Sequence, residues 1–249
     1  MIDKSEITNL AIRGKINAAD IKILRNAADK LATLDTLDIS MVELVPSNEA
    51  YYIYTTMSDG SMNAEYHRFF ISTERRDTFF IQASLSSWPP HYYDHYDHNL
   101  TAAFTGTRFK RIIMPKNISD IGERTFMGCG NLQEVVMSEA PTSIGAEAFR
   151  DCKTLMLIPE LNKAESIGER AFYNCAQLGL LTQAKHLDLS SVVEIDNSAF
   201  ENCKYIASVK CSDHLRSIGG GAFSGCTSLV SFNLPANLAR LSYDSFENT

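Results

Sequence analysis

Five of the six cysteines recur at a nearly constant interval, and this spacing limits what the chain can fold into. They are Cys129, Cys152, Cys175, Cys203 and Cys226, separated by 23, 23, 28 and 23 residues. An Ile or Leu holds a fixed phase at 121, 144, 167, 195, 218 and 241, and a Phe follows each five residues later. A unit of 23 residues cannot bury its own apolar side, so each unit must stack on the next. Residues 100–249 are therefore predicted to form a solenoid.

Each coil of this solenoid is predicted to hold one short parallel strand and one helical turn. The stretch 132–137 is short and partly β-branched, and the Ile-Gly pair followed by Ala-Phe suits a turn. Five extra residues explain the step of 28 and are predicted to form a surface loop within 182–191. One apolar column of the strands is predicted at Ile112, Val135, Ile158, Leu181, Val209 and Phe232.

The cysteines themselves are predicted to form a buried ladder of free thiols. No C-x-x-C pair is present, and ligands placed one per coil would form a row and not a tetrahedron around zinc. Free Cys is a small and commonly buried apolar residue. Cys211 falls in a strand column, so it also has a structural explanation. We expect no cysteine to serve catalysis or bind metal.

The repeat Ile-Gly-x-x-Ala-Phe-x-x-Cys-x-x-Leu, clearest from Ile218 to Pro235, resembles the BspA-like leucine-rich repeats of bacterial surface proteins. This resemblance implies an α/β leucine-rich-repeat solenoid in a secreted or cell-surface binding protein, often of gut or oral Bacteroidetes. It brings no catalytic or cofactor residues. Two units depart from the pattern, because Glu160 and Gln183 fall in an inward column and Pro159 sits in a strand. The middle coils are therefore predicted to be kinked or shifted in register.

Residues 1–45 are predicted to be an N-terminal cap of strand, helix and strand. Asn17 with Asp20 is typical of a helix start, and apolar residues at helical spacing predict a helix over 18–32. The stretch 34–39 repeats the strand pattern of the coils. Such a cap would cover the apolar end that a stack of coils otherwise exposes.

Residues 46–99 are predicted to be a β-rich insertion, because they hold 12 of the 24 aromatic residues. Three runs, 51–55, 68–72 and 78–82, predict a three-stranded meander. In one interpretation the rings pack on the first coils and lengthen the cap. In the other they form an exposed platform that could stack on sugar rings. The residues proposed for that platform, placed in an exposed loop, are Trp88, Tyr92, Tyr93 and Tyr96.

A weak metal-binding hypothesis concerns three histidines at the end of the insertion. On a helix, His91, His95 and His98 would share one face, which imidazole ligands can use for zinc. Pro89 and Pro90 oppose a helix there, and a solvated loop is the ordinary interpretation.

The outward strand positions of the earlier coils are apolar where those of the later coils are polar. Val136, Leu157 and Leu180 are predicted to form an exposed strip that contacts a partner protein. The alternative is that Pro159 shifts the register and turns the leucines into the core.

Charge and motifs exclude several classes of function. The net charge of −7 opposes binding to nucleic acid, and no apolar run is long enough to span a membrane. Neither a nucleophile elbow nor a phosphate-binding loop is visible, so we expect no enzyme and no cofactor. The sequence favours a protein-binding module in adhesion or host recognition. A glycan-binding module and a structural spacer are the alternatives, and the ligand, organism and oligomeric state are not specified.

Overall fold

The computed structural model describes the side chains of the repeats and of most of the N-terminal unit. It covers 7–31, 33–45, 100, 102–181 and 185–249, and the backbone alone of 52–57, 64–71, 79–82 and 91–97.

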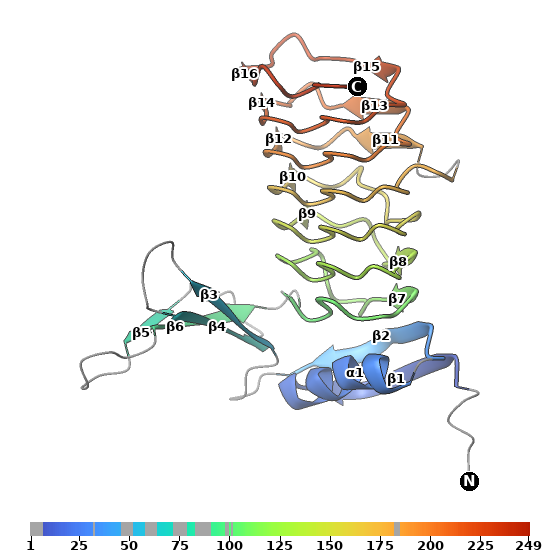
Figure 1. Ribbon diagram of the computed structural model, residues 1–249, viewed down its shortest axis with the longest axis vertical. Helices are drawn as coiled ribbons and strands as arrows, with labels where there is room; N and C mark the ends of the chain where they lie inside the picture. The colour runs from blue at the N-terminus through green and yellow to red at the C-terminus, as the bar shows by residue number, and fades with distance from the viewer. Residues whose placement is uncertain are drawn as a thin grey trace.

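The coils stack in one direction, and two groups of parallel strands line one face of the stack (Figure 1). We call this surface the front face. Its first sheet has the order β1-β2-β7-β8, and its second has the order β11-β13-β15. The bounds are β1 Asn9–Ile16, β2 Thr36–Leu44, β7 Arg111–Ile113, β8 Glu134–Val136, β11 His186–Leu189, β13 Ser208–Cys211 and β15 Ser231–Phe232.

A second face carries a parallel sheet of two-residue strands, which we call the side sheet. Its order is β16-β14-β12-β10-β9, with one strand from each of five consecutive coils. The buried isoleucine of one strand lies in register with that of the next, as Ile144 does with Ile167. The bounds are β9 Ser143–Ile144, β10 Ser166–Ile167, β12 Glu194–Ile195, β14 Ser217–Ile218 and β16 Arg240–Leu241.

The turns between the two faces stack their phenylalanine rings through the core. Consecutive ring centroids lie 5.0 to 5.8 Å apart with nearly parallel planes, an arrangement that aromatic pairs favour. The stack begins at Phe104, one coil before the first copy found in the sequence. That coil is atypical because Thr107 holds the cysteine position, where its hydroxyl lies 3.5 Å from the Cys129 thiol. The members are Phe104, Phe126, Phe149, Phe172, Phe200, Phe223 and Phe246.

The predicted thiol ladder is confirmed. The five repeat cysteines are buried and free, and each thiol donates to the phenylalanine carbonyl oxygen of the preceding coil at 2.9 to 3.2 Å. Burial raises the pKa of Cys175 and Cys203, and it raises that of Cys226 to about 12. Because the thiolate is the reactive form, these three thiols are poor nucleophiles.

Glycine in the Ile-Gly pair allows neighbouring coils to approach. A Cβ on Gly168 would lie 2.6 Å from the backbone nitrogen of Ala146, and one on Gly145 would lie 2.5 Å from that of Glu123. Both contacts are to backbone, which cannot swing away as a side chain can.

The N-terminal unit continues the front face through β1 and β2, and one helix connects these two strands. β2 pairs with β7 so that Leu37 is opposite Ile112. The helix α1, Ala18–Lys30, starts with a capping box between Asn17 and Asp20, as the sequence predicts. It buries Ala18, Ile21, Leu24 and Ala28.

The insertion forms a sheet of its own, drawn to one side of the stack in Figure 1. Its strands are β3 Tyr52–Met57, β4 Ala64–Ile71, β5 Phe79–Gln82 and β6 His91–Asp97, in the order β3-β4-β6-β5. The predicted three-stranded meander is wrong, because β6 enters between β4 and β5 and runs parallel to β4. Three tyrosines after Pro90 give this segment a strand propensity that the preceding prolines obscured.

The predicted column is also wrong in the coil with the extra residues. β11 pairs Leu187 with Val209 and Leu189 with Cys211, so Leu187 takes the position assigned to Leu181. Leu181 is exposed, because the extra residues precede the strand. Gln183, assigned to the neighbouring column, lies outside the described residues.

The part of the chain that the structure describes contains no helix with the length and apolar character needed to cross a membrane.

Candidate functional site

The front face is interrupted at the coil that carries Pro159. Met156 and Leu157 donate their backbone N–H groups to the Gln133 carbonyl oxygen at 3.0 Å. Pairing with β8 stops at the bridge between Glu134 and Leu157. Proline has no N–H to extend a ladder, and a central strand is a position it normally avoids. Among the described residues, no backbone hydrogen bond joins 157–162 to β11.

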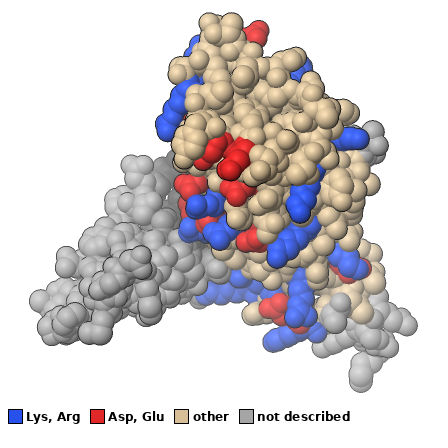
Figure 2. Space-filling model, turned by 45° about the horizontal axis from the view of Figure 1, so that its top comes forward, with Lys and Arg blue, Asp and Glu red and all other residues tan. Residues whose placement is uncertain are grey.

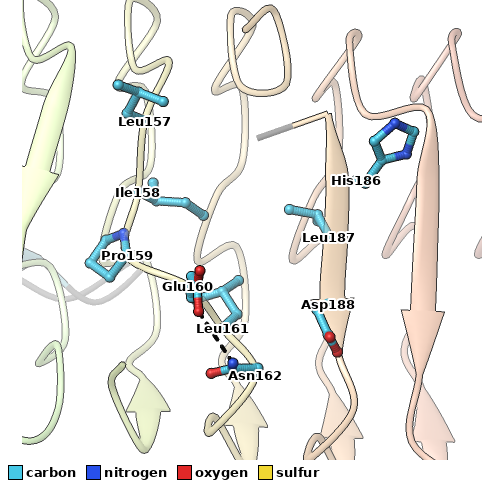
Figure 3. Close-up of a pocket in the computed structure, with 9 residues that line it drawn as sticks. All are labelled: Leu157, Ile158, Pro159, Glu160, Leu161, Asn162, His186, Leu187 and Asp188. Atoms are coloured by element: carbon cyan, nitrogen blue, oxygen red, sulfur yellow. Dashed lines mark hydrogen bonds between the residues drawn. The ribbon is translucent and has the colours of Figure 1, made fainter. Parts of the chain in front are cut away.

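A cavity of about 280 Å³ lies where the pairing is missing. We call it the Pro159 gap. Figure 3 shows the segment 157–162 on one side and β11 on the other, with Ile158 directed toward β11 and Asn162 hydrogen-bonded to Glu160. The cavity is smaller than most small-molecule sites, which occupy roughly 300–1,000 Å³. Its lining residues are Leu157, Ile158, Pro159, Glu160, Leu161, Asn162, His186, Leu187 and Asp188.

The structure separates the three residues of the predicted contact strip. Val136 and Leu157 are half-buried, and the bridge to Glu134 keeps Leu157 in the outward register, so Pro159 does not turn it into the core. Leu180 is 46% exposed but belongs to the inserted loop, and His186 takes the position that the sequence assigns to it. Ile113 lies in register with Val136 and adds a further outward apolar residue to this surface.

Charged residues border this apolar strip on both sides. Arg111 pairs with Glu134 at 2.5 Å, and beyond the gap Lys210 pairs with Asp188 at 3.2 Å. A hydrogen bond from Ser190 and then the contact with Lys210 outweigh partial burial and lower the pKa of Asp188. The carboxylate is therefore charged at neutral pH.

Charges of both signs lie mixed over the described residues on the face that Figure 2 shows, with no large basic area there. The turns of the early coils hold a buried example, where Glu147 accepts from Arg124 at 2.6 Å and also from Arg150. Desolvation would raise the pKa of Glu147, but the two arginines outweigh it and hold the pKa below its usual value. The pair of Arg124 with Glu147 links two neighbouring coils.

The histidine hypothesis loses its geometric basis. His91 and His95 lie in the strand β6, so the helical spacing assumed for His91, His95 and His98 is wrong. His98 lies outside the described residues. Within the described part of the chain, no group of three or more His, Cys, Asp or Glu could hold a metal ion.

The proposed aromatic platform is not tested by the structure. Tyr92, Tyr93 and Tyr96 belong to β6 and not to the predicted loop. Trp88 lies outside the described residues.

The sequence does not predict the gap as a site, although it holds two signals of it. Pro159 marks the failed strand, and the spacing of 28 marks the loop just before β11. Only the three-dimensional register shows that these features belong to neighbouring coils and border one cavity.

Residues 100–188 and 164–249 match the family model for the BspA type leucine rich repeat region, which is present in six copies. No curated protein matches the chain. The fold is similar to a T. pallidum leucine-rich repeat protein with 22% identity and a TM-score of 0.49, over 76% of this chain and 83% of that one. A leucine-rich cell surface protein of Faecalibacterium prausnitzii matches with 20% sequence identity and a TM-score of 0.44. The match covers 81% of this chain and 52% of that one. A leucine-rich repeat protein from Bacteroides ovatus matches with 15% sequence identity and a TM-score of 0.21. The match covers 79% of this chain and 90% of that one.

Proposed function

Because this chain belongs to the BspA-type leucine-rich repeat family, we propose that it is a non-catalytic protein-binding module of a secreted or cell-surface bacterial protein. Its role would be adhesion or recognition of a host or partner protein. The interaction surface is the front face of residues 100–249. Residues 1–45 would serve as the N-terminal cap and 46–99 as a separate insertion.

The observation that carries this proposal is the half-buried apolar strip beside the Pro159 gap. Val136 and Leu157 project from a regular parallel sheet, and a cavity opens where the next strand should pair. Rigid strands hold the surface in place, and exposed apolar area rimmed by charges is typical of protein-binding sites. Burial raises the pKa of four of the five ladder thiols, so these four are poor nucleophiles. They are Cys152, Cys175, Cys203 and Cys226.

The test is a binding measurement against a panel of purified, immobilised extracellular proteins. We expect at least one saturable interaction that a Val136→Asp and Leu157→Asp double variant weakens at least tenfold. Val193→Asp is the matched control, because Val193 is 37% exposed and flanks the side sheet. Circular dichroism of each variant would verify that the fold is retained. Equal binding by the double variant and wild type would overturn the assignment to the front face.

A second candidate function is glycan binding through the insertion. It is favoured by the separate sheet that this segment forms and by the aromatic residues concentrated in it. A glycan array would test it with wild type, Trp88→Ala and a variant in which a short linker replaces 47–98. Glycan signals lost in both variants would support this function. Failure of both the array and the protein panel would favour the spacer.

A further inference from the structure

The lining of the Pro159 gap carries negative charge without a basic residue among the described residues that form it. Glu160 is exposed and Asp188 is half-buried, and both carboxylates border the cavity. Lys210 approaches Asp188 at 3.2 Å from the next strand and does not line the gap. His186 is exposed at the rim and hydrogen-bonds Ser208 at 2.7 Å. The chemistry of the cavity therefore favours a cation.

Hydrogen-bond acceptors also border the gap. Asn162 donates through its amide nitrogen to Glu160 at 3.3 Å, whereas its Oδ1 is buried and has no hydrogen-bond partner among the described residues. The Lys185 carbonyl accepts from Ala207, the residue before β13, at 2.9 Å. Since alternate residues of a strand direct their backbone groups to opposite neighbours, both the carbonyl and the N–H groups of His186 and Asp188 face the gap. Buried or half-buried acceptors of this kind are normally paired.

The remaining walls are apolar and suit an aliphatic stem. Leu157, Ile158 and Pro159 stand on one side, and Leu187 lies on the other. A volume of about 280 Å³ corresponds to roughly nine waters at about 30 Å³ each, which is the scale of one long side chain. Lysine and arginine bury their stems along apolar surface while the charged end seeks acceptors.

We propose that the Pro159 gap receives an arginine side chain from the partner protein, an assignment that rests on the proposed function and names the chemistry of its partner. The guanidinium group presents five donors in a planar fork, so it can serve Glu160, Asp188 and a neutral acceptor together. An ammonium group has three donors around a point charge and suits divided acceptors less well. The side chains of Leu157 and Val136 then contact the residues that flank this arginine.

Nuclear magnetic resonance titration of the full chain with acetyl-Gly-Arg-Gly-amide tests this assignment. We expect saturable shifts of the amides in 157–162 and 186–188, weaker shifts with the lysine tripeptide, and none with the isosteric but uncharged citrulline tripeptide. Glu160→Gln is expected to weaken arginine binding about tenfold, because one charge-assisted contact is lost. The control is Glu165→Gln, an exposed carboxylate that accompanies the side sheet.

Three results would overturn the assignment: no saturable shift at tripeptide concentrations up to tens of millimolar, equal binding of citrulline, or equal loss in the Glu165→Gln control. Asp188→Asn is a second variant that is expected to weaken arginine binding. Lys210→Met removes the ion-pair partner of Asp188 but keeps both carboxylates of the gap, so it separates loss of that ion pair from loss of the site. If the protein panel responds to Leu157→Asp while the arginine tripeptide does not bind, only this inference fails. If no protein binds but the tripeptide does, the proposed function fails and the pocket stands.

Discussion

Replacing Phe172 by Ala tests how much the ring stack contributes to the free energy of unfolding. Phe172 is fully buried between Phe149 and Phe200, whose ring centroids lie 5.0 and 5.1 Å away. An aromatic side chain buries about 150–250 Å², and at about 25 cal/mol per Å² its burial contributes about 4–6 kcal/mol. Alanine retains part of that area but leaves a cavity, so the free energy of unfolding should fall by about 3–5 kcal/mol.

The matched control is Phe246→Ala at the last coil. Phe246 is only half-buried and stacks on one neighbour, Phe223, at 5.5 Å, with an edge contact to Phe232. Its loss should cost less than half as much as that of Phe172. Urea unfolding followed by far-ultraviolet circular dichroism measures both, with the slope of the transition compared because repeat proteins can lose cooperativity. A fall below 1 kcal/mol for Phe172→Ala, or equal effects of the two changes, would refute the reasoning.

Three further predictions concern thiols, pH and coil spacing. In native protein at pH 8, iodoacetamide should label the half-buried Cys211 before any ladder thiol, as peptide mass spectrometry would show; its pKa is raised by burial to about 11, so even this reaction should be slow. The pKa of Glu147 is lowered in the folded protein, so its ion pairs contribute stability at pH values above the unfolded pKa of 4.5. That stability is lost as the pH falls through the folded pKa. Glu147→Gln should therefore flatten the loss of thermal stability in acid, and parallel curves of melting temperature against pH for the variant and wild type would contradict this. Gly168→Ala should lower the free energy of unfolding in urea by about 1–3 kcal/mol, because the added Cβ meets backbone atoms. Gly130→Ala places its Cβ in open space and should change the free energy of unfolding by under about 0.5 kcal/mol. Similar effects of the two substitutions would show that the coils can separate.

The repeat could be predicted from sequence because each coil makes the same contacts as its neighbour. A residue that must stack on its own kind, as Phe149 does on Phe172, has to recur at the coil length. The coil of Phe104 was missed because Thr107 replaces the cysteine and because the next phenylalanine comes after 22 residues. The position of Phe104 in the ring stack is set by burial in the core and not by a match of its coil to the repeat pattern.

The strand of the coil with the extra residues could not be assigned in the same way, since two leucines compete for one position in the apolar column. Leu181 fits the simple spacing, but Leu187 starts an alternating Leu-x-Leu pattern that pairs with β13. Where a loop is inserted, the count of residues no longer fixes the register, and cross-strand pairing decides it. Strand order in the insertion has the same origin, because the parallel pairing of β4 with β6 is a long-range contact that local propensity does not encode.

The Pro159 gap shows how the repeat combines a fixed core with a variable surface. On the turn side the same two coils remain in contact, since Phe149 donates its N–H to the Ala171 carbonyl at 2.7 Å and its ring lies 5.0 Å from Phe172. The loss of pairing is therefore confined to the front face. Substitutions in the gap should alter binding with little effect on unfolding, whereas substitutions in the ring stack should do the reverse. A gap variant such as Glu160→Gln that unfolds as easily as Phe172→Ala would show that the two faces are not independent.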